Sequence, residues 1–170
     1  MHYSFRAPAG IIWMAPASGW GMPATSAQDR AEKDRRWPAV LRKLKGLHKR
    51  GRRSIRIVDA DCGTGELLLH AVRRAREMGF LAIEGRGIDA DASLVASARR
   101  AAARQPDPAI GLVFEQAEKD RVMREEAEYP ADLLLCSATD AEARELAALA
   151  RTAANTVLWD RTAKIRGEDA

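Results

Sequence analysis

The stretch Ile55-Arg-Ile-Val-Asp-Ala-Asp-Cys-Gly-Thr-Gly-Glu66 decides the fold of this chain. Its first part alternates isoleucine with polar side chains and ends in Asp59, a pattern that predicts a short β-strand over 54–59. Gly63 and Gly65 then make a tight turn, and an apolar helical pattern follows directly. Glycine permits positive φ and lets a ligand approach the backbone, and the start of the helix behind it offers unpaired N–H groups to a carboxylate or phosphate. The stretch therefore predicts a strand, a ligand-binding turn and a helix.

Strand and helix patterns alternate outward from this stretch to the end of the chain. Further strands are expected within 81–89, 112–114, 132–136 and 156–159, and helices over 65–78, 93–103, 119–128 and from Thr139, where Glu142 completes a capping box. Five strands separated by helices predict an α/β fold with a mostly parallel sheet that helices cover on both faces. Ligands of such sheets bind at the carboxyl ends of the strands, where the strand order reverses.

Two helical segments are expected before the first strand. Helical signals begin at Ser26, which resembles a capping box with Asp29. The second segment has Pro38 in its first turn, where a missing N–H does no harm, and it ends at Gly51. Its apolar face consists of Val40, Leu41, Leu44 and Leu47.

Residues 1–25 are interpreted as an irregular N-terminal arm, rich in proline and glycine. Trp13 and Trp20 lie within it, and a large indole ring usually docks on a surface. Two interpretations stay open, namely packing against the domain and a lid over a ligand. The segment lacks the uninterrupted apolar core and the cleavage site of a signal peptide, so secretion is not expected.

The composition is that of a soluble globular protein. The 170 residues carry a formal net charge of +4, with 46% hydrophobic and 31% charged residues, which excludes wholesale disorder, collagen and coiled coils. No window approaches the roughly 18 apolar residues of a membrane span, so no membrane partner is expected. Cys62 and Cys136 are too few for a disulfide framework and favour a reducing, cytoplasmic location. His48 and His70 have no partner at metal-ligand spacing, so no metal is predicted.

Two motifs carry a resemblance to a known family. The run Asp59-Ala-Asp-Cys-Gly-Thr-Gly65 resembles the first motif of class I S-adenosylmethionine-dependent methyltransferases, which usually reads Asp-x-Gly-Cys-Gly-Thr-Gly. Gly87-Ile-Asp89 and the helical pattern after it resemble the second motif. The resemblance implies a Rossmann-like three-layer sandwich whose five-stranded sheet lacks the family's usual last two strands. In that arrangement 1–25 is the arm, 26–53 forms N-terminal helices, and 54–170 is the cofactor-binding domain.

The resemblance also implies S-adenosyl-L-methionine as the cofactor and a set of residues that bind it. These are Asp59, Ala60, Asp61, Cys62, Gly63, Gly65, Asp89, Ala90, Ala117 and Glu118. The glycine backbone would approach the methionine end, and Asp89 would accept hydrogen bonds from both ribose hydroxyls, since a carboxylate accepts two at once. Glu118 is a candidate for the adenine amino group, with a solvated helix start as the alternative.

The sequence departs from the family pattern in three places. Asp61 stands where the family has its first glycine, which puts a negative charge near the carboxylate of the cofactor. No Asp/Asn-Pro-Pro-aromatic signature follows Cys136, which is interpreted as a small core residue rather than a nucleophile. The last strand is expected to be an open edge, so the N-terminal helices, the C-terminal tail or a second copy in a homodimer should cover it.

The function expected from the resemblance is methyl transfer by direct displacement to a small-molecule acceptor. One alternative is an inactive cofactor-binding or scaffold protein of the same fold. Another is a nucleic-acid methyltransferase that uses the basic segment Arg42–Arg53. A nicotinamide enzyme fits less well, because its Gly-x-Gly-x-x-Gly fingerprint would need glycine where Leu68 stands. The sequence names no catalytic base.

Overall fold

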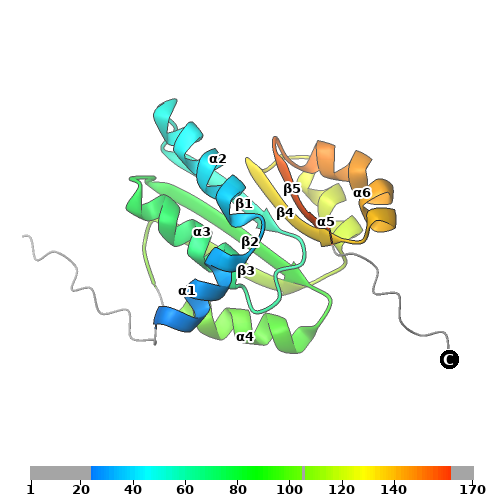
Figure 1. Cartoon of the computed structure of the whole chain (residues 1–170), viewed down its shortest axis with the longest axis horizontal. Helices are drawn as coiled ribbons and strands as arrows, with labels where there is room; N and C mark the ends of the chain where they lie inside the picture. The colour runs from blue at the N-terminus through cyan, green and yellow to red at the C-terminus, as the bar shows by residue number, and fades with distance from the viewer. Residues whose placement is uncertain (1–23, 105, 162–170) are drawn as a thin grey trace, which may run out of the picture.

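The computed structural model describes residues 24–104 and 106–161, and Figure 1 shows their arrangement. The elements are α1 (Ala24–Lys33), α2 (Trp37–Lys49), β1 (Ser54–Asp59), α3 (Glu66–Glu77), β2 (Ala82–Asp89), α4 (Ala92–Ala103), β3 (Ile110–Gln116), α5 (Lys119–Glu126), β4 (Leu133–Ala138), α6 (Asp140–Ala153) and β5 (Val157–Arg161). The predicted arm with Trp13 and Trp20 lies outside the described residues, except that Ala24 and Thr25 belong to α1.

The strands form one sheet in the order β3-β2-β1-β4-β5, and every neighbouring pair is parallel. The chain moves outward from β1 to β2 and β3, then returns to the other side of β1 for β4 and β5. The strand order therefore reverses between β1 and β4, and a ligand is expected at the carboxyl ends of these strands. The structure confirms the predicted α/β, Rossmann-like fold with N-terminal helices.

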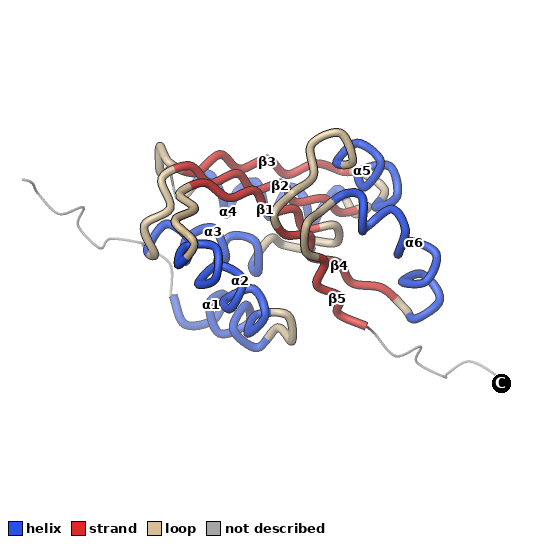
Figure 2. The backbone as a smooth tube through the Cα atoms, turned by 90° about the horizontal axis from the view of Figure 1, so that it is seen from above, coloured by secondary structure: helices blue, strands red, loops and turns tan. Residues whose placement is uncertain are grey.

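Helices cover both faces of the sheet and enclose two apolar clusters. The first cluster joins α2, α3 and α4 to the sheet, and the second joins α5 and α6 to its other face. Figure 2, seen from above, shows α5 and α6 lying away from α1, α2 and α3. Helix α2 buries Val40, Leu44 and Leu47 in the first cluster, as its apolar pattern predicts, while Leu41 is only half-buried.

Element boundaries differ from the sequence prediction at a few places. Strand β3 spans Ile110–Gln116 rather than 112–114, because it pairs with β2 along its whole length, from Ile83↔Ile110 to Asp89↔Gln116. Helix α1 begins at Ala24, ahead of the predicted start at Ser26. The capping box of Thr139 and Glu142 at the start of α6 is confirmed.

A buried carboxylate anchors the short helix α5 to the sheet. Glu126 is 2% exposed and accepts hydrogen bonds from Arg56 of β1 and from Arg86 of β2, the latter at 2.7 Å. A buried charge is stable only when it is paired in this way. The contact holds α5 against the sheet, and Lys119 at its first position lies near the predicted site, 3.6 Å from Asp61.

Strand β5 forms one edge of the sheet. Within residues 24–104 and 106–161 it pairs with β4 and with no further strand. Helix α2 reaches its face, since Lys43 donates a hydrogen bond to Thr156 and Leu158 packs against the first cluster. Helix α2 thus lies near the face of this strand, whereas coverage of its free edge by the N-terminal helices, the C-terminal tail or a second copy stays a prediction.

None of the helices in the described part of the chain has the length and apolar character needed to span a bilayer.

The Phe114 ring lies against two glycines and leaves no room for a side chain on either. A Cβ built on Gly87 would come within 2.5 Å of the Phe114 ring and 3.1 Å of the Cys62 sulfur. A Cβ on Gly65 would come within 2.9 Å of the same ring. Glycine at these positions therefore lets Phe114 of β3 pack directly against the turn through Gly63 and Gly65.

We predict that Gly87→Ala destabilises the protein. The added methyl overlaps an aromatic ring that is itself buried, so the free energy of unfolding should fall by about 1–3 kcal/mol, the usual cost of overpacking. Gly111→Ala is the matched control on β3, because the nearest atom to its new Cβ lies 4.0 Å away. Urea unfolding measures both variants, and equal stabilities of the two would contradict the packing account.

Candidate functional site

The glycine loop, residues 59–65, lies at the carboxyl end of β1 between the ends of its two neighbours. Ala60 N donates to Leu135 O of β4 at 2.8 Å, and Cys62 N donates to Ile88 O of β2 at 2.8 Å. These backbone bonds hold the loop across the point where the strand order reverses. Ala60 and Cys62 are buried and act through their backbone.

Positive φ occurs in this loop only at its glycines. Gly63 has φ 54° and Gly65 has φ 80°, and no non-glycine residue in the described part of the chain has positive φ. Gly65 also precedes α3 with no side chain capping the helix, so the first N–H groups of α3 face the loop. Asp61 consequently fits in the place of the family's first glycine without backbone strain.

The Asp61 carboxylate has a cationic partner. Its Oδ2 lies 3.6 Å from Lys119 Nζ, and the same ammonium donates to Ser137 O at the end of β4 at 2.9 Å. Burial raises the pKa of Asp61, and the positive charge of Lys119 opposes that shift. The repulsion expected between Asp61 and an anionic ligand is therefore reduced.

Asp89 joins the glycine loop to the start of α4. Its Oδ2 accepts from Gly63 N and its Oδ1 accepts from Asp91 N, both at 2.9 Å. A carboxylate has about four acceptor positions, so each oxygen of Asp89 can accept one more hydrogen bond. The side chain is largely buried, with 9% of the residue exposed. This geometry is compatible with the predicted role of holding a vicinal diol.

The remaining predicted residues meet beyond Asp89, at the ends of β2 and β3. Ala117 N donates to Asp89 O at 3.1 Å, and the Gln116 amide donates to Ala90 O at 2.9 Å. Glu118 is exposed at the start of α5, and its side chain does not cap that helix. The structure thus brings Asp89, Ala90 and Ala117 together, with the Glu118 carboxylate at the rim.

The corner between α1 and α2 forms the opposite wall of a cavity of about 200 Å³ over the glycine loop. The loop side contributes Asp59, Asp61, Cys62, Gly63 and Thr64, followed by Glu66 and Leu67 of α3, and the corner contributes Arg30, Ala31, Asp34 and Arg36. Arg30 Nε donates to both oxygens of Glu66 at 2.9 Å, which ties α1 to the first residue of α3. The α1–α2 corner therefore forms one wall of the site.

Arg36 is buried between two aspartates in this cavity. Its Nε and Nη2 donate to the two oxygens of Asp34 at 3.0 and 2.7 Å. Its Nη1 lies 3.7 Å from Asp59 Oδ1, and within residues 24–104 and 106–161 neither of these two atoms has a hydrogen-bond partner. Buried polar atoms in folded proteins are usually satisfied, so an unsatisfied guanidinium N–H beside an unsatisfied carboxylate oxygen marks a place for a ligand or water.

Burial raises the pKa of Asp59 from 3.8 to about 7, and the positive charge of Arg36 offsets only part of this shift. Asp34 already neutralises much of the Arg36 charge, and the negative charges of Asp34, Asp61 and Asp89 raise the pKa further. Asp59 therefore exchanges a proton near neutral pH, and a cationic ligand would favour its ionised form.

Neither cysteine lies in an environment that favours the thiolate form. Burial raises the pKa of both thiols to about 12, so they are protonated at neutral pH. Cys136 is fully buried in the second apolar cluster, which confirms its interpretation as a core residue. Within the residues that the structure describes, no group of three histidine, cysteine or acidic side chains could hold a metal.

Sequence reasoning missed the side chains that surround the loop from outside the motif. These are Arg30, Asp34, Arg36, Glu66 and Lys119. Arg30, Asp34 and Arg36 lie in a polar stretch whose charges resemble those of any solvated helix. One hint is present in the sequence. Arg36 and Trp37 come directly before Pro38, which predicts a helix start, and side chains at a helix start can point toward the interior of the protein.

Comparison with known proteins places the fold in a recognisable group. No protein-family model and no curated protein matches the chain in sequence. In structure it is similar to a proposed O-methyltransferase from Klebsiella pneumoniae, with TM-score 0.53, 15% identity, and coverage of 79% of this chain and 61% of that one. It is also similar to a proposed caffeoyl-CoA O-methyltransferase from Staphylococcus aureus, with TM-score 0.52, 9% identity, and coverage of 72% and 56%.

A third similar structure is magnesium protoporphyrin IX methyltransferase from Synechocystis PCC 6803 with bound SAH, with TM-score 0.50 and 16% identity. The match covers 72% of this chain and 53% of that one. The chain therefore spans between about half and three-fifths of the length of these three proteins. It has the fold of class I S-adenosylmethionine-dependent methyltransferases, which confirms the resemblance stated from the two motifs.

We predict that Asp59→Asn changes how stability depends on pH. The folded protein keeps the Asp59 proton up to about pH 7, whereas the unfolded chain loses it near its ordinary pKa of about 4. Between these values the folded state binds more protons, so the free energy of unfolding falls as the pH rises, by at most about 1.4 kcal/mol per pH unit from this group. Asparagine is uncharged throughout and lacks this loss.

Urea unfolding between about pH 4.5 and 6.5 measures the effect. The stability of Asp59→Asn relative to the native protein should rise with pH across this window. The control is Asp29→Asn, which changes an exposed aspartate of α1. Parallel curves for the native protein and Asp59→Asn would show that Asp59 is already ionised at the lower pH.

Proposed function

We propose that this chain is an S-adenosylmethionine-dependent methyltransferase and that the cofactor binds between the glycine loop and the α1–α2 corner. The observation that carries the proposal is the unsatisfied pair of Arg36 Nη1 and Asp59 Oδ1, two buried atoms of side chains that line the cavity over the loop. The amino-acid end of the cofactor carries a carboxylate and an ammonium side by side. A guanidinium donor next to a carboxylate acceptor is the complementary arrangement.

The order of groups along the sheet edge supports the same placement. The Arg36 and Asp59 pair lies at the end of β1, Asp89 at the end of β2, and Ala117 with Glu118 beyond β3. A ligand with an amino-acid end, a ribose and a base in that order would meet a charged pair, a diol acceptor and a rim carboxylate in turn. The residues present therefore fit the cofactor.

Methyl transfer at this site would depend on how the cofactor is positioned more than on acid or base side chains. When bound, the cofactor supplies a methyl group on a sulfonium, which is already activated for displacement. The residues of the chain orient that group: the loop backbone fixes the amino-acid end, and Asp89 fixes the ribose. The fold similarity supports this assignment, and a small-molecule acceptor stays a prediction. A binding protein without activity is the alternative.

We predict that calorimetric titration detects micromolar binding of S-adenosylmethionine and S-adenosylhomocysteine, and that Asp89→Ala weakens both by at least tenfold. The substitution removes the diol acceptor and the bond that holds Gly63. Asp120→Ala, which removes a half-exposed aspartate at the start of α5, is the control for charge. Absence of binding to the native chain at millimolar ligand would refute the proposal. If S-adenosylmethionine binds but is not converted to S-adenosylhomocysteine with any mixture of acceptors tested, the inactive alternative is favoured.

A second prediction isolates the amino-acid end of the ligand. Arg36→Lys keeps the charge that balances Asp34 but loses the Nη1 donor, so S-adenosylhomocysteine should bind roughly tenfold more weakly, the effect of one charge-assisted hydrogen bond. Methylthioadenosine, which has the ribose and base but no amino-acid end, should bind the variant and the native protein within twofold. Equal weakening of both ligands would place the amino-acid end elsewhere.

A further inference from the structure

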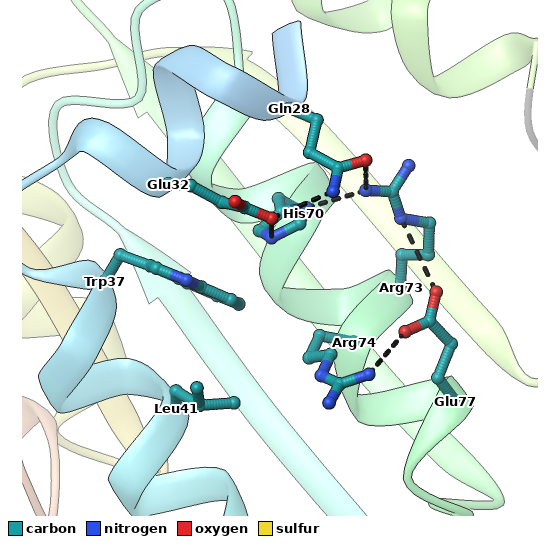
Figure 3. A pocket seen from close by; sticks show the side chains of 8 residues that line it. All are labelled: Gln28, Glu32, Trp37, Leu41, His70, Arg73, Arg74 and Glu77. Atoms are coloured by element: carbon teal, nitrogen blue, oxygen red, sulfur yellow. Dashed lines mark hydrogen bonds and ion pairs between the residues drawn. The ribbon is translucent and has the colours of Figure 1, made fainter. Parts of the chain in front are cut away.

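A second cavity, of about 430 Å³, opens between α1, α2 and α3. Figure 3 shows the eight side chains that line it: Gln28, Glu32, Trp37, Leu41, His70, Arg73, Arg74 and Glu77. Helix α1 separates it from the glycine loop, because Gln28 and Glu32 face this cavity whereas Arg30 and Asp34 face the other. The second cavity is thus distinct from the proposed cofactor site.

His70 has a buried hydrogen-bond donor that no group in the described part of the chain accepts. It is 7% exposed, and its Nδ1 lies 2.7 Å from Arg73 Nη2. Since arginine only donates, Nδ1 is the acceptor and the proton of the neutral ring is on Nε2. Nε2 has no hydrogen-bond partner, and the Glu32 carboxylate lies 3.5 Å away. Burial lowers the pKa of His70, and the Arg73 charge lowers it further, which favours this neutral form.

Trp37 provides an aromatic wall. The indole projects from α2 toward α3 in Figure 3, half-buried, with its ring centroid 4.3 Å from that of His70 and the planes tilted by 55°. Leu41 lies one turn further along α2, and Arg74 on the facing helix pairs with Glu77 at 2.9 Å. An aromatic surface beside one N–H donor, one carboxylate acceptor and a guanidinium suits a planar ring whose edge carries both donors and acceptors, as a nucleobase does.

A basic surface begins at the edge of this cavity. Arg42, Lys45 and Lys49 are exposed on the outer face of α2, and Lys45 follows Leu41 by one turn. None of the ion pairs formed among residues 24–104 and 106–161 includes these three side chains, whereas Lys43 bonds Thr156 and Arg52 pairs with Asp132. Among the described residues, the three side chains are therefore exposed and form no ion pair.

We propose that this cavity and the adjoining basic face of α2 bind single-stranded nucleic acid. One unstacked base lies against Trp37 in the cavity, with its edge toward His70 and Glu32, and the neighbouring phosphates lie along Arg42, Lys45 and Lys49. A base in a duplex is stacked and paired, so it cannot enter. Because α1 stands between this base and the glycine loop, the surface holds the strand rather than presenting the acceptor atom. The proposal is therefore independent of methyl transfer.

Fluorescence anisotropy with labelled 12-nucleotide strands of mixed sequence tests the phosphate contacts. Single-stranded RNA and single-stranded DNA are measured in parallel to show which of the two binds more tightly. The double variant Arg42→Glu/Lys45→Glu should weaken binding at least tenfold. The matched control Arg144→Glu/Arg151→Glu makes the same charge change on exposed arginines of α6 and should stay within threefold of the native protein. Three phosphate contacts predict a loss of about 20-fold between about 50 and 200 mM salt for a single strand.

An abasic strand of the same length tests the cavity. One stacked base contributes about 1–3 kcal/mol, so the base-bearing strand should bind roughly 5- to 150-fold more tightly than the abasic one. In Trp37→Leu this ratio should fall to near one, a change that general destabilisation would not produce. Leu41→Trp, which fills the cavity from α2, should lower the ratio in the same way if Trp37→Leu fails to fold.

Three outcomes would overturn the proposal. They are an equal effect of the two double variants, an abasic strand that binds as tightly as the base-bearing one, and a duplex that binds as tightly as the single strand. Absence of binding to both RNA and DNA at low salt would also overturn it. Calorimetry with S-adenosylhomocysteine keeps the two proposals apart, since Arg42→Glu/Lys45→Glu should leave cofactor binding unchanged.

Discussion

The carboxylate of Asp89 is the contact on which the rest of the site depends. By accepting one backbone N–H from Gly63 and one from Asp91, it joins the glycine loop to the start of α4 and holds the ends of β1 and β2 in register. The loop can lie this close to β2 and β3 only because Gly65 and Gly87 leave room for the Phe114 ring. Asp89, Gly65 and Gly87 thus position the glycine loop and the start of α4, where the cofactor is proposed to bind.

Burial of charge gives the site its electrostatic character. Arg36 enters the interior in company with Asp34, and this pairing lets Asp59 lie within 3.7 Å of the guanidinium without a full ion pair of its own. Two buried polar atoms remain unsatisfied as a result. Such a pair is costly to the folded protein and is expected where a ligand of complementary charge repays the desolvation on binding.

Helix α1 is the wall that two cavities share. Its residues alternate between them, with Arg30 and Ala31 on the loop side and Gln28 and Glu32 on the side of His70. Arg36 and Trp37, consecutive in sequence, likewise point into the two different cavities. A ligand in either cavity contacts the same short helix, so the α1–α2 corner is the element through which the two proposed sites would influence each other.

The sequence by itself determined the parallel α/β fold, the turn through Gly63 and Gly65, and the position of Asp89, because strand periodicity, glycine and an acidic strand end are local signals. It also determined that Cys136 belongs to the core. Only the tertiary structure decided the length of β3, which pairing with β2 sets, and the partner of Asp61, which α5 supplies. It alone decided that Arg36 is buried, since one charged side chain in a basic stretch is indistinguishable from its exposed neighbours until a second helix and a strand end close around it.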